Sequence, residues 1–202
     1  MAKIMFDLMI LITWAFILPL NIIRVTGHLF IRFFRRFGIF SFLLYIVLCL
    51  ACAFLIFLNS NLFLQGKMFK NNITISAIGI IFLCLGLFLQ VLGFKTLGIK
   101  AVFGIPEILS KKEKGILIIN GPFLLVRHPL YLGQLFLIIG LLLLTFELSL
   151  FLLLAIVIIF VWPVTILEEK ELIERFGQAY IDYQKRVPRI LPGLGIIKFI
   201  FK

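Results

Sequence analysis

Two short groups of charged side chains flank neighbouring apolar segments. Arg127 and His128 come directly before Pro129, and Glu168 and Glu169 come directly after a later apolar run. Two acidic and two basic side chains can bind a charged small molecule, and histidine or glutamate can also transfer a proton. These residues are therefore the first candidates for chemistry.

The spacing of the two groups predicts that they meet in space. Segments 130–144 and 148–167 are apolar, and the short sequence Thr145-Phe146-Glu147 separates them, which indicates a helical hairpin. His128 and Glu168 lie roughly 19 and 21 residues from this turn, so at about 1.5 Å rise per residue both reach the same depth. We therefore expect one cluster that holds an arginine, a histidine and two carboxylates.

The local sequence favours an anion site at the start of the hairpin. Pro129 suits the first helical turn because it lacks the N–H group that goes unpaired there. His128 then takes the capping position, and the amides of Tyr131 and Leu132 are expected to form a partly positive site for a carboxylate. Gly121, followed by proline, marks a turn that can bring backbone close to a ligand.

Each feature also has a plainer interpretation. An arginine and a histidine at a helix end often only anchor lipid headgroups, and two glutamates after a span can begin a solvated helix. Tyr180 and Tyr183 can be ordinary interfacial aromatics. Only the convergence of these features favours a binding site.

Composition places these groups in a membrane protein. Of the 202 residues 63% are hydrophobic and only 14% are charged, whereas soluble domains have about a quarter charged. Five apolar blocks approach the roughly 20 residues that cross a bilayer as a helix. The sequence predicts an all-α, polytopic membrane protein of a single domain, with about five transmembrane helices at residues 4–23, 39–58, 73–92, 130–144 and 148–167.

The formal charge of +11 is distributed very unevenly. The loops 24–38 and 93–129 and the tail after residue 167 hold nearly all lysines and arginines, whereas only Lys3, Lys67 and Lys70 lie on the opposite side. This bias predicts an outer N-terminus and a cytosolic C-terminus. Basic residues at the ends of apolar blocks suit membrane lipids better than nucleic acid, and we expect no nucleic-acid partner.

The cysteines do not indicate a metal site. Cys49, Cys52 and Cys84 all lie in apolar segments, and no second cysteine pair or histidine cluster accompanies the C-x-x-C spacing. We expect no metal and no disulfide framework.

Two motifs around the hairpin resemble those of the isoprenylcysteine carboxyl methyltransferase-like and phospholipid methyltransferase families. The first resembles G-P-[YF]-x-x-V-R-H-P-x-Y-x-G and is formed by Gly121-Pro122-Phe123 and Val126-Arg127-His128-Pro129-Leu130-Tyr131-Leu132-Gly133. The second resembles E-E-x-x-L-x-x-x-F-G-x-x-Y-x-x-Y-x-x-x-V-P-R and runs from Glu168 to Arg189. The resemblance covers roughly residues 115–192, and the first three spans match only as membrane helices.

The resemblance implies that residues 95–202 form a cytosol-facing pocket for S-adenosylmethionine. Residues 1–94 would form three transmembrane helices that precede this region in the chain. The C-terminal segment caps this pocket, which opens to lipid for the methyl acceptor. Backbone of residues 116–121 would contact the adenosine part. The implied catalytic residues are Glu168, Glu169 and Arg127, and the implied cofactor-binding residues are Gly121, Arg127, His128, Pro129, Tyr131, Leu132, Gly133, Glu168, Glu169, Tyr180, Tyr183 and Arg186.

The expected reaction is methyl transfer from S-adenosylmethionine to a lipophilic or small acceptor, first a thiol or carboxylate and then a phospholipid amine. Two alternatives remain. Integral-membrane sterol reductases resemble this region and bind NADPH, but they usually carry an acidic residue after the glycine, where this chain has Gln134. The other alternative is a non-catalytic member of the same superfamily that has a role in assembly or transport.

Overall fold

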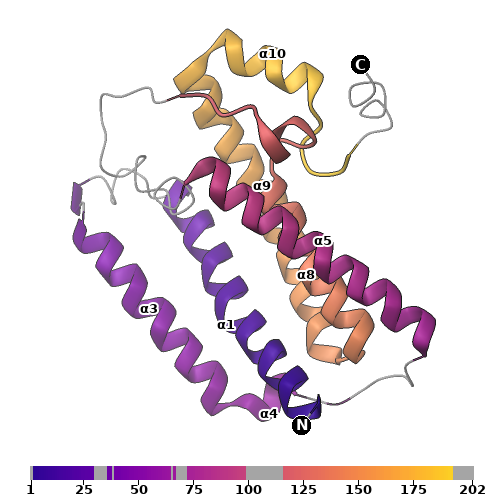
Figure 1. The fold of residues 1–202 in the computed structure, drawn as a ribbon. Coiled ribbons are helices and arrows are strands. Elements are labelled where there is room, and N and C mark those ends of the chain that lie inside the picture. The colour runs from indigo at the N-terminus through magenta and orange to yellow at the C-terminus, as the bar shows by residue number, and fades with distance from the viewer. Residues whose placement is uncertain are drawn as a thin grey trace.

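A computed structural model describes residues 2–29, 36–37, 39–64, 66, 72–98 and 116–192. These residues form helices and no strand, which confirms the all-α prediction (Figure 1). The helices are α1 (Ala2–Leu29), α3 (Ile39–Leu58), α4 (Ser60–Phe63), α5 (Ile73–Leu97), the 3-10 helix η1 (Gly121–Leu124), α8 (Pro129–Thr145), α9 (Leu148–Phe176) and α10 (Gln178–Arg186).

Five apolar helices occupy the five predicted positions, and the chain is an integral membrane protein. Three segments are long and apolar enough to cross a bilayer, namely Lys3–Gly27, Ile73–Leu97 and Leu148–Phe176. The other two apolar helices are shorter, and the 17 residues of α8 rise about 26 Å, slightly less than a bilayer core of about 30 Å.

One predicted boundary is wrong in a way that affects the site. The hydropathy pattern predicts that the fifth apolar segment ends at residue 167, with Glu168 and Glu169 after it. Instead α9 continues without a break to Phe176, despite Pro163 inside it. Glu168 and Glu169 therefore project from the same continuous helix as the fifth apolar segment.

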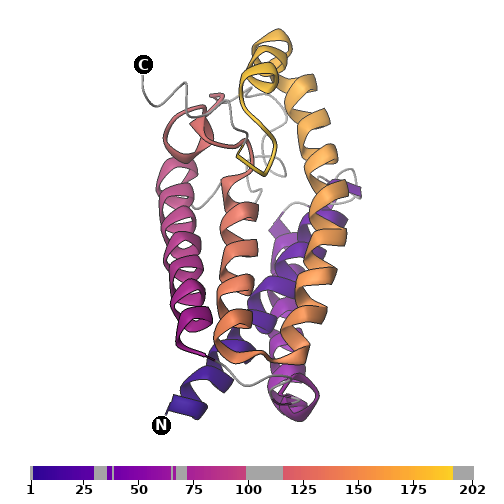
Figure 2. The same ribbon diagram turned by 90° about the vertical axis from the view of Figure 1, so that its right-hand side faces the viewer.

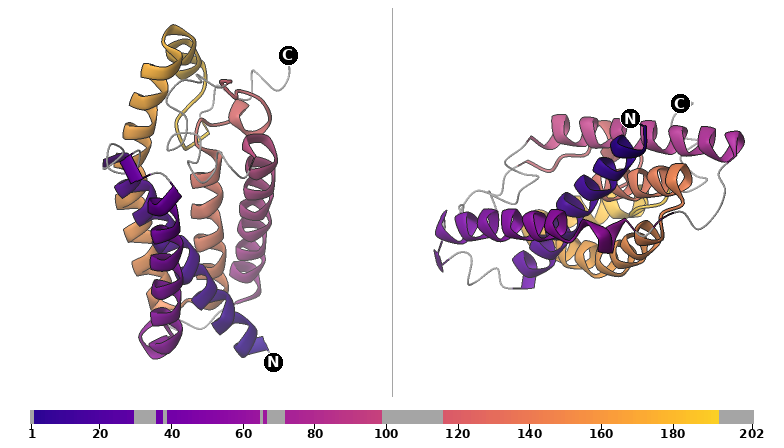
Figure 3. Two further views of the ribbon diagram at one scale, coloured as in Figure 1. Left: turned by 90° about the vertical axis from the view of Figure 1, so that its left-hand side faces the viewer. Right: turned by 90° about the horizontal axis from the view of Figure 1, so that it is seen from below.

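α1 lies between α3 and the other long helices (Figures 1 and 2). It packs against α3, α9 and α8, and its buried side chains join those of α8 and α9 in the main apolar core. The view along the bundle in Figure 3 shows α3 and α5 on opposite sides of this core. α10 lies at the end of the bundle where α8 begins and α9 ends, and we call this the α10 end.

The most extensive helix contact joins α5 to α8 along a seam of glycines. Gly79 and Gly86 on α5 meet Gly140 and Gly133 on α8, and a Cβ built at Gly86 would lie 2.9 Å from the carbonyl oxygen of Gly133. Small residues let helix backbones approach closely, which is a main source of packing energy in lipid. The seam fixes α8 on α5, and so fixes the height of the residues that precede α8.

The opposite end of the bundle is closed by polar contacts to the hairpin turn. Phe146 ends α8 in a left-handed conformation, with φ of 52°, at the predicted turn. The buried carboxylate of Glu147 accepts a hydrogen bond of 2.8 Å from the Gly66 amide, and Ser149 donates one of 2.6 Å to the Phe63 carbonyl. These bonds hold the hairpin in register with the region after α4.

Candidate active site

The carboxylate of Glu169 is the centre of the charged cluster at the α10 end. Oε1 accepts from Nε of Arg127 at 2.8 Å and lies 3.2 Å from Nε2 of His128. Oε2 accepts from Nη2 of Arg189 at 2.7 Å and from Nε2 of Gln184 at 3.0 Å. Glu169 is only 3% exposed, so its charge is stabilised by these donors rather than by water. The hairpin spacing correctly predicted that the glutamates meet Arg127 and His128.

Arg127 also fixes the end of α10. Its Nη1 donates to the carbonyls of Gln184 at 2.9 Å and of Val187 at 2.7 Å, which are among the unpaired carbonyls at the end of that helix. Its backbone amide donates to the Pro188 carbonyl at 2.8 Å, and the amide of His128 donates to that of Arg189 at 3.0 Å. Arg127 therefore positions the C-terminal segment as well as Glu169.

Glu168 has a different environment from Glu169. Its Oε1 accepts a 2.5 Å hydrogen bond from the Tyr131 hydroxyl, and its Oε2 lies 3.3 Å from Nδ1 of His128. The side chain of Glu168 is 22% exposed, compared with 4% for that of Glu169. Glu168 is the more exposed of the two carboxylates.

His128 lies between the two glutamates, with Nδ1 toward Glu168 and Nε2 toward Glu169. Both bonds form together only when both ring nitrogens carry hydrogen, which is the cationic form. Burial alone would lower the pKa of His128, but the hydrogen bonds to Glu168 and Glu169 outweigh burial and raise that pKa above its ordinary value. His128 therefore bridges the two carboxylates, and its cationic form is the form that bonds both of them.

Two buried tyrosines attach α10 to the segment before α8. The Tyr183 hydroxyl donates to the Phe123 carbonyl at 2.6 Å, and Tyr180 packs against Tyr183 with ring centroids 5.7 Å apart. Burial raises the pKa of both tyrosines, so both stay neutral. Their observed contacts stabilise the position of α10.

α1 also reaches the cluster, which no sequence motif indicates. The guanidinium carbon of Arg24 lies 4.5 Å from the centroid of the Tyr131 ring, a cation–π distance. Asn21, one turn earlier on α1, is fully buried. The position of Arg24 in the sequence indicates only a charge that sets topology, and the packing of α1 against α8 reveals this second role.

Comparison with known proteins identifies a family that matches the part of the chain containing α8, α9 and both charged pairs, Arg127-His128 and Glu168-Glu169. Residues 74–179, slightly more than half of the chain, match the phospholipid methyltransferase family. The chain belongs to this family. The family is one of membrane methyltransferases, and its match includes α5, α8, α9 and the start of α10 but neither α1 nor α3.

Two curated relatives match a shorter part of this phospholipid methyltransferase family member. The chain is 30% identical over 90 residues to the nickel-cobalt-cadmium resistance protein NccN of Alcaligenes xylosoxydans xylosoxydans. It is 29% identical over 90 residues to the cobalt-zinc-cadmium resistance protein CzcN of Cupriavidus metallidurans. Each match covers 45% of this chain and 42% of the relative's length. No solved structure matches the chain.

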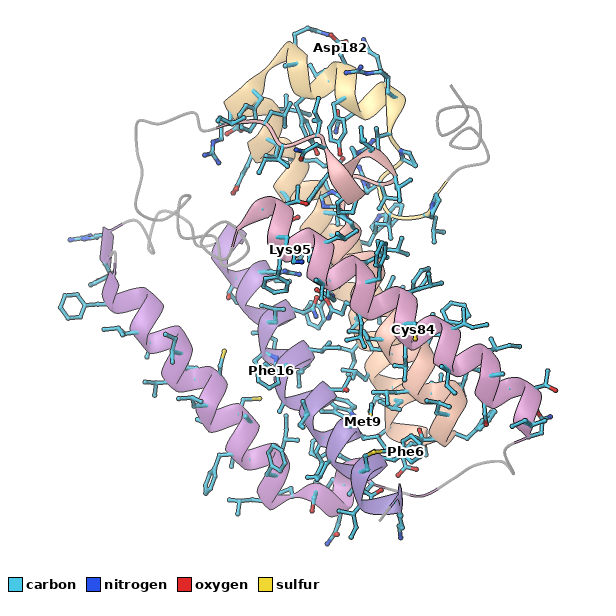
Figure 4. All side chains as sticks on the ribbon, viewed as in Figure 1. Phe6, Met9, Phe16, Cys84, Lys95 and Asp182 are labelled. Carbon is cyan, nitrogen blue, oxygen red and sulfur yellow. The ribbon has the colours of Figure 1, made fainter. Side chains whose placement is uncertain are left out.

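Several residues that the family resemblance placed at the cofactor lie elsewhere or are already bonded. Arg186 is exposed and donates to the Asp182 carbonyl of its own helix. Figure 4 shows the labelled Asp182 on α10, at the top of the view. Gly133 faces α5, the Leu132 amide already donates to the His128 carbonyl at 3.2 Å, and buried Pro129 begins α8. Gly121 lies before α8 with φ of 57°, beside Thr96 of α5.

Arg189 is the site residue that the sequence interpretation missed. It binds Glu169 through two hydrogen bonds, and its guanidinium lies 5.5 Å from the ring centroid of Trp162. The V-P-R motif was the sequence signal for Arg189. The carbonyls of Pro188 and Arg189 in this motif accept hydrogen bonds from the backbone amides of Arg127 and His128. This pairing turns Arg189 toward the cluster.

Proposed function

We propose that this chain is an S-adenosylmethionine-dependent membrane methyltransferase that acts on a lipophilic or small acceptor with a thiol or carboxylate group. The observation that carries the proposal is the pair of unlike glutamates. Glu169 forms ion pairs with Arg127 and Arg189. Glu168 instead contacts Tyr131 and His128, and its side chain is 22% exposed. A fixed, partly exposed carboxylate next to fixed cations suits a ligand that carries both signs of charge.

The residues present fit S-adenosylmethionine by the chemistry of their donor and acceptor groups. Its ammonium group and ribose hydroxyls need acceptors, which Glu168 and the exposed backbone at residues 119–121 supply. Its carboxylate needs donors, which the Leu130 and Tyr131 amides in the first turn of α8 supply, because these precede the first intrahelical bond.

S-adenosylmethionine supplies an electrophilic methyl group on a sulfonium, whose bonding pair stays on sulfur as the acceptor takes the methyl group. The residues of this chain contribute position and environment. Tyr131 and His128 fix the rotamer of Glu168, and Arg127 and Arg189 fix Glu169 and the segment that covers it. Holding reacting groups in place can supply about 7–11 kcal/mol of a barrier, so these positioning bonds matter even without a proton transfer.

The α10 end of the bundle is the cytosolic end in this proposal. Arg24 near the end of α1, Lys95 in the last turn of α5 and the basic residues of α10 all lie at this end. Membrane proteins carry their excess of lysine and arginine on the cytoplasmic side. The cluster would then draw its cofactor from the cytosol and its acceptor from the lipid.

Methyl transfer in membranes tests this function even when the acceptor is unidentified. Membranes that contain the wild type or Glu168→Gln are incubated with methyl-tritiated S-adenosylmethionine, and labelled products are separated as base-labile esters, thioethers and amines. We expect a labelled ester or thioether with the wild type only. Equal labelling by both proteins would remove Glu168 from the site, and a labelled amine would redirect the acceptor class.

A further inference from the structure

Arg24, at the α10 end of α1, is a cation beside the cluster. It has no carboxylate partner among the described residues. Arg24 lies 4.5 Å from the centroid of the Tyr131 ring, and Tyr131 in turn bonds Glu168. No ion pair joins Arg24 to a carboxylate in the described part of the chain, whereas Arg127 and Arg189 both bind Glu169. Arg24 thus bonds the Tyr131 side chain, next to Glu168, and pairs with no carboxylate in the described part of the chain.

Two buried amide side chains have unpaired atoms, Asn21 one turn before Arg24 on α1 and Gln134 one turn after Tyr131 on α8. Asn21 is 0% exposed, and its Nδ2 donates to the Ile17 carbonyl at 2.8 Å, while its Oδ1 has no hydrogen-bond partner among the described residues. Gln134 is 3% exposed, and its Nε2 likewise has no partner there. An unsatisfied buried polar group costs about 1–3 kcal/mol, and polar residues inside transmembrane helices mark functional positions.

The helix geometry places these two amides at the same level. Asn21 precedes Arg24 by one turn of α1, and Gln134 follows Tyr131 by one turn of α8. α1 and α8 are in contact and run in opposite directions, as Figures 1 and 2 show. Asn21 and Gln134 therefore both lie one turn further into the bundle than the contact of Arg24 with Tyr131. An unpaired acceptor and an unpaired donor therefore lie on facing helices, one turn deeper than Glu168.

The layer beyond the two amides is apolar. Ile17 on α1 and Ile138 on α8, each one further turn into the bundle, belong to the main core cluster. The amides of Asn21 and Gln134 are thus followed, further into the bundle, by apolar side chains.

We propose that Arg24, Asn21 and Gln134 form the site that binds the head of the methyl acceptor, and that this head is anionic. The inference rests on the proposed function and names the residues that would bind the acceptor and the charge that they would select. Arg24 provides the countercharge, and the two amides provide a donor and an acceptor below it. An anionic head needs no base to remove a proton, which agrees with Glu169 and His128 being fully engaged with each other and with Arg127.

Two of the three residues that would provide this selectivity lie outside the family match. Residues 74–179 match the phospholipid methyltransferase family, and they include Gln134 but not Arg24 or Asn21. The choice of acceptor is therefore assigned to two residues of α1 together with Gln134 of α8.

Binding of a simple anionic amphiphile tests the proposal without turnover. The protein in lipid nanodiscs is first saturated with S-adenosylhomocysteine, and the Kd of decanoate is then measured by calorimetry, with decylamine as the cationic counterpart. We expect wild type to bind decanoate and not decylamine. Arg24→Gln should weaken decanoate binding at least about tenfold, which corresponds to about 1.4 kcal/mol. Arg24→Lys should retain part of the affinity.

The controls separate failure of this inference from failure of the proposed function. Arg36→Gln, at an exposed position that precedes α3, should leave decanoate binding unchanged. Gln134→Leu should weaken decanoate binding while the affinity for S-adenosylhomocysteine stays within about twofold of wild type. Equal decanoate affinity in wild type and Arg24→Gln, no decanoate binding, or a preference for decylamine would overturn the acceptor site. Absence of S-adenosylhomocysteine binding by the wild type would instead contradict the proposed function.

Discussion

Arg189 binds the carboxylate of Glu169 with two of its nitrogens, Nη2 to Oε2 at 2.7 Å and Nε to Oε1 at 3.1 Å. This paired contact joins the segment after α10 to the last third of α9. Because Glu169 also binds Arg127, which precedes α8, three parts of the chain meet at one carboxylate. The carboxylate of Glu169 thus holds both the segment after α10 and the segment before α8.

The two arginines at the end of the described chain should respond very differently to substitution. Arg189→Gln removes the paired contact to Glu169 and should lower thermal stability, and it should weaken binding of S-adenosylmethionine at least about tenfold. Arg186→Gln, the matched control, removes only an exposed bond to the Asp182 carbonyl and should leave both unchanged. Thermal unfolding and equilibrium binding in detergent measure the difference. Equal losses in the two variants would mean that the Arg189 contact contributes nothing special.

Neutralising Glu169 should destabilise the protein rather than only inactivate it. Glu169→Gln leaves Arg127 and Arg189 near a neutral amide in a buried site, and breaking such a pair costs about 3–5 kcal/mol. Membrane insertion should persist, because topology follows the lysine and arginine distribution. Glu174→Gln, exposed on the same helix, is the control. A thermal midpoint for Glu169→Gln equal to that of the control would contradict the central role of this carboxylate.

The state of His128 predicts a pH dependence of stability. Its pKa is raised in the folded protein above the ordinary 6.5, because hydrogen bonds to Glu168 and Glu169 outweigh burial. The stabilisation is therefore complete below the unfolded-state pKa and is lost as pH rises through the higher folded-state pKa. Thermal midpoints measured from about pH 6 to about pH 9 should fall for wild type. His128→Gln should show a flatter profile, and an unchanged slope in that variant would assign the titration to another group.

The glycine seam predicts a size limit between α5 and α8. In Gly86→Ala the new Cβ would lie 2.8 Å from Cγ of Leu137 and 2.9 Å from the Gly133 carbonyl oxygen, so the helices must separate. Overpacking of this kind costs about 1–3 kcal/mol. Gly27→Ala in α1, where a Cβ meets nothing within 4 Å, should cost nothing. Unfolding in detergent compares the two, and equal stability would show that the seam tolerates a wider spacing.

The sequence predicted the helices and the meeting of the two charged groups because both follow from local rules. Apolar length indicates a span, and similar distances from the turn at Thr145-Phe146-Glu147 place His128 and Glu168 at about one depth. The end of α9 was misplaced because hydropathy falls at Glu168 while the helix continues to Phe176. Charged residues end an apolar run without ending a helix.

The remaining site residues could not be predicted because they depend on long-range packing. Arg24 reaches Tyr131 across more than a hundred residues of sequence, and no local pattern states that α1 lies beside α8. The sequence favoured Arg186 over Arg189 for a related reason. Pairing of the Pro188 and Arg189 carbonyls with the amides of Arg127 and His128 decides which arginine faces Glu169.

Binding of S-adenosylmethionine, compared with binding of NADPH, tests the proposed function most directly. The measurement is calorimetry on purified wild type, Glu168→Gln and Tyr131→Phe, with Ser149→Ala as a control that loses a hydroxyl bond at the opposite end of the bundle. We predict that the wild type binds S-adenosylmethionine and not NADPH, that the first two variants bind it at least about tenfold more weakly, and that the control stays near wild type. Binding of NADPH alone, or of neither molecule by a folded wild type, would contradict the assignment as a methyltransferase.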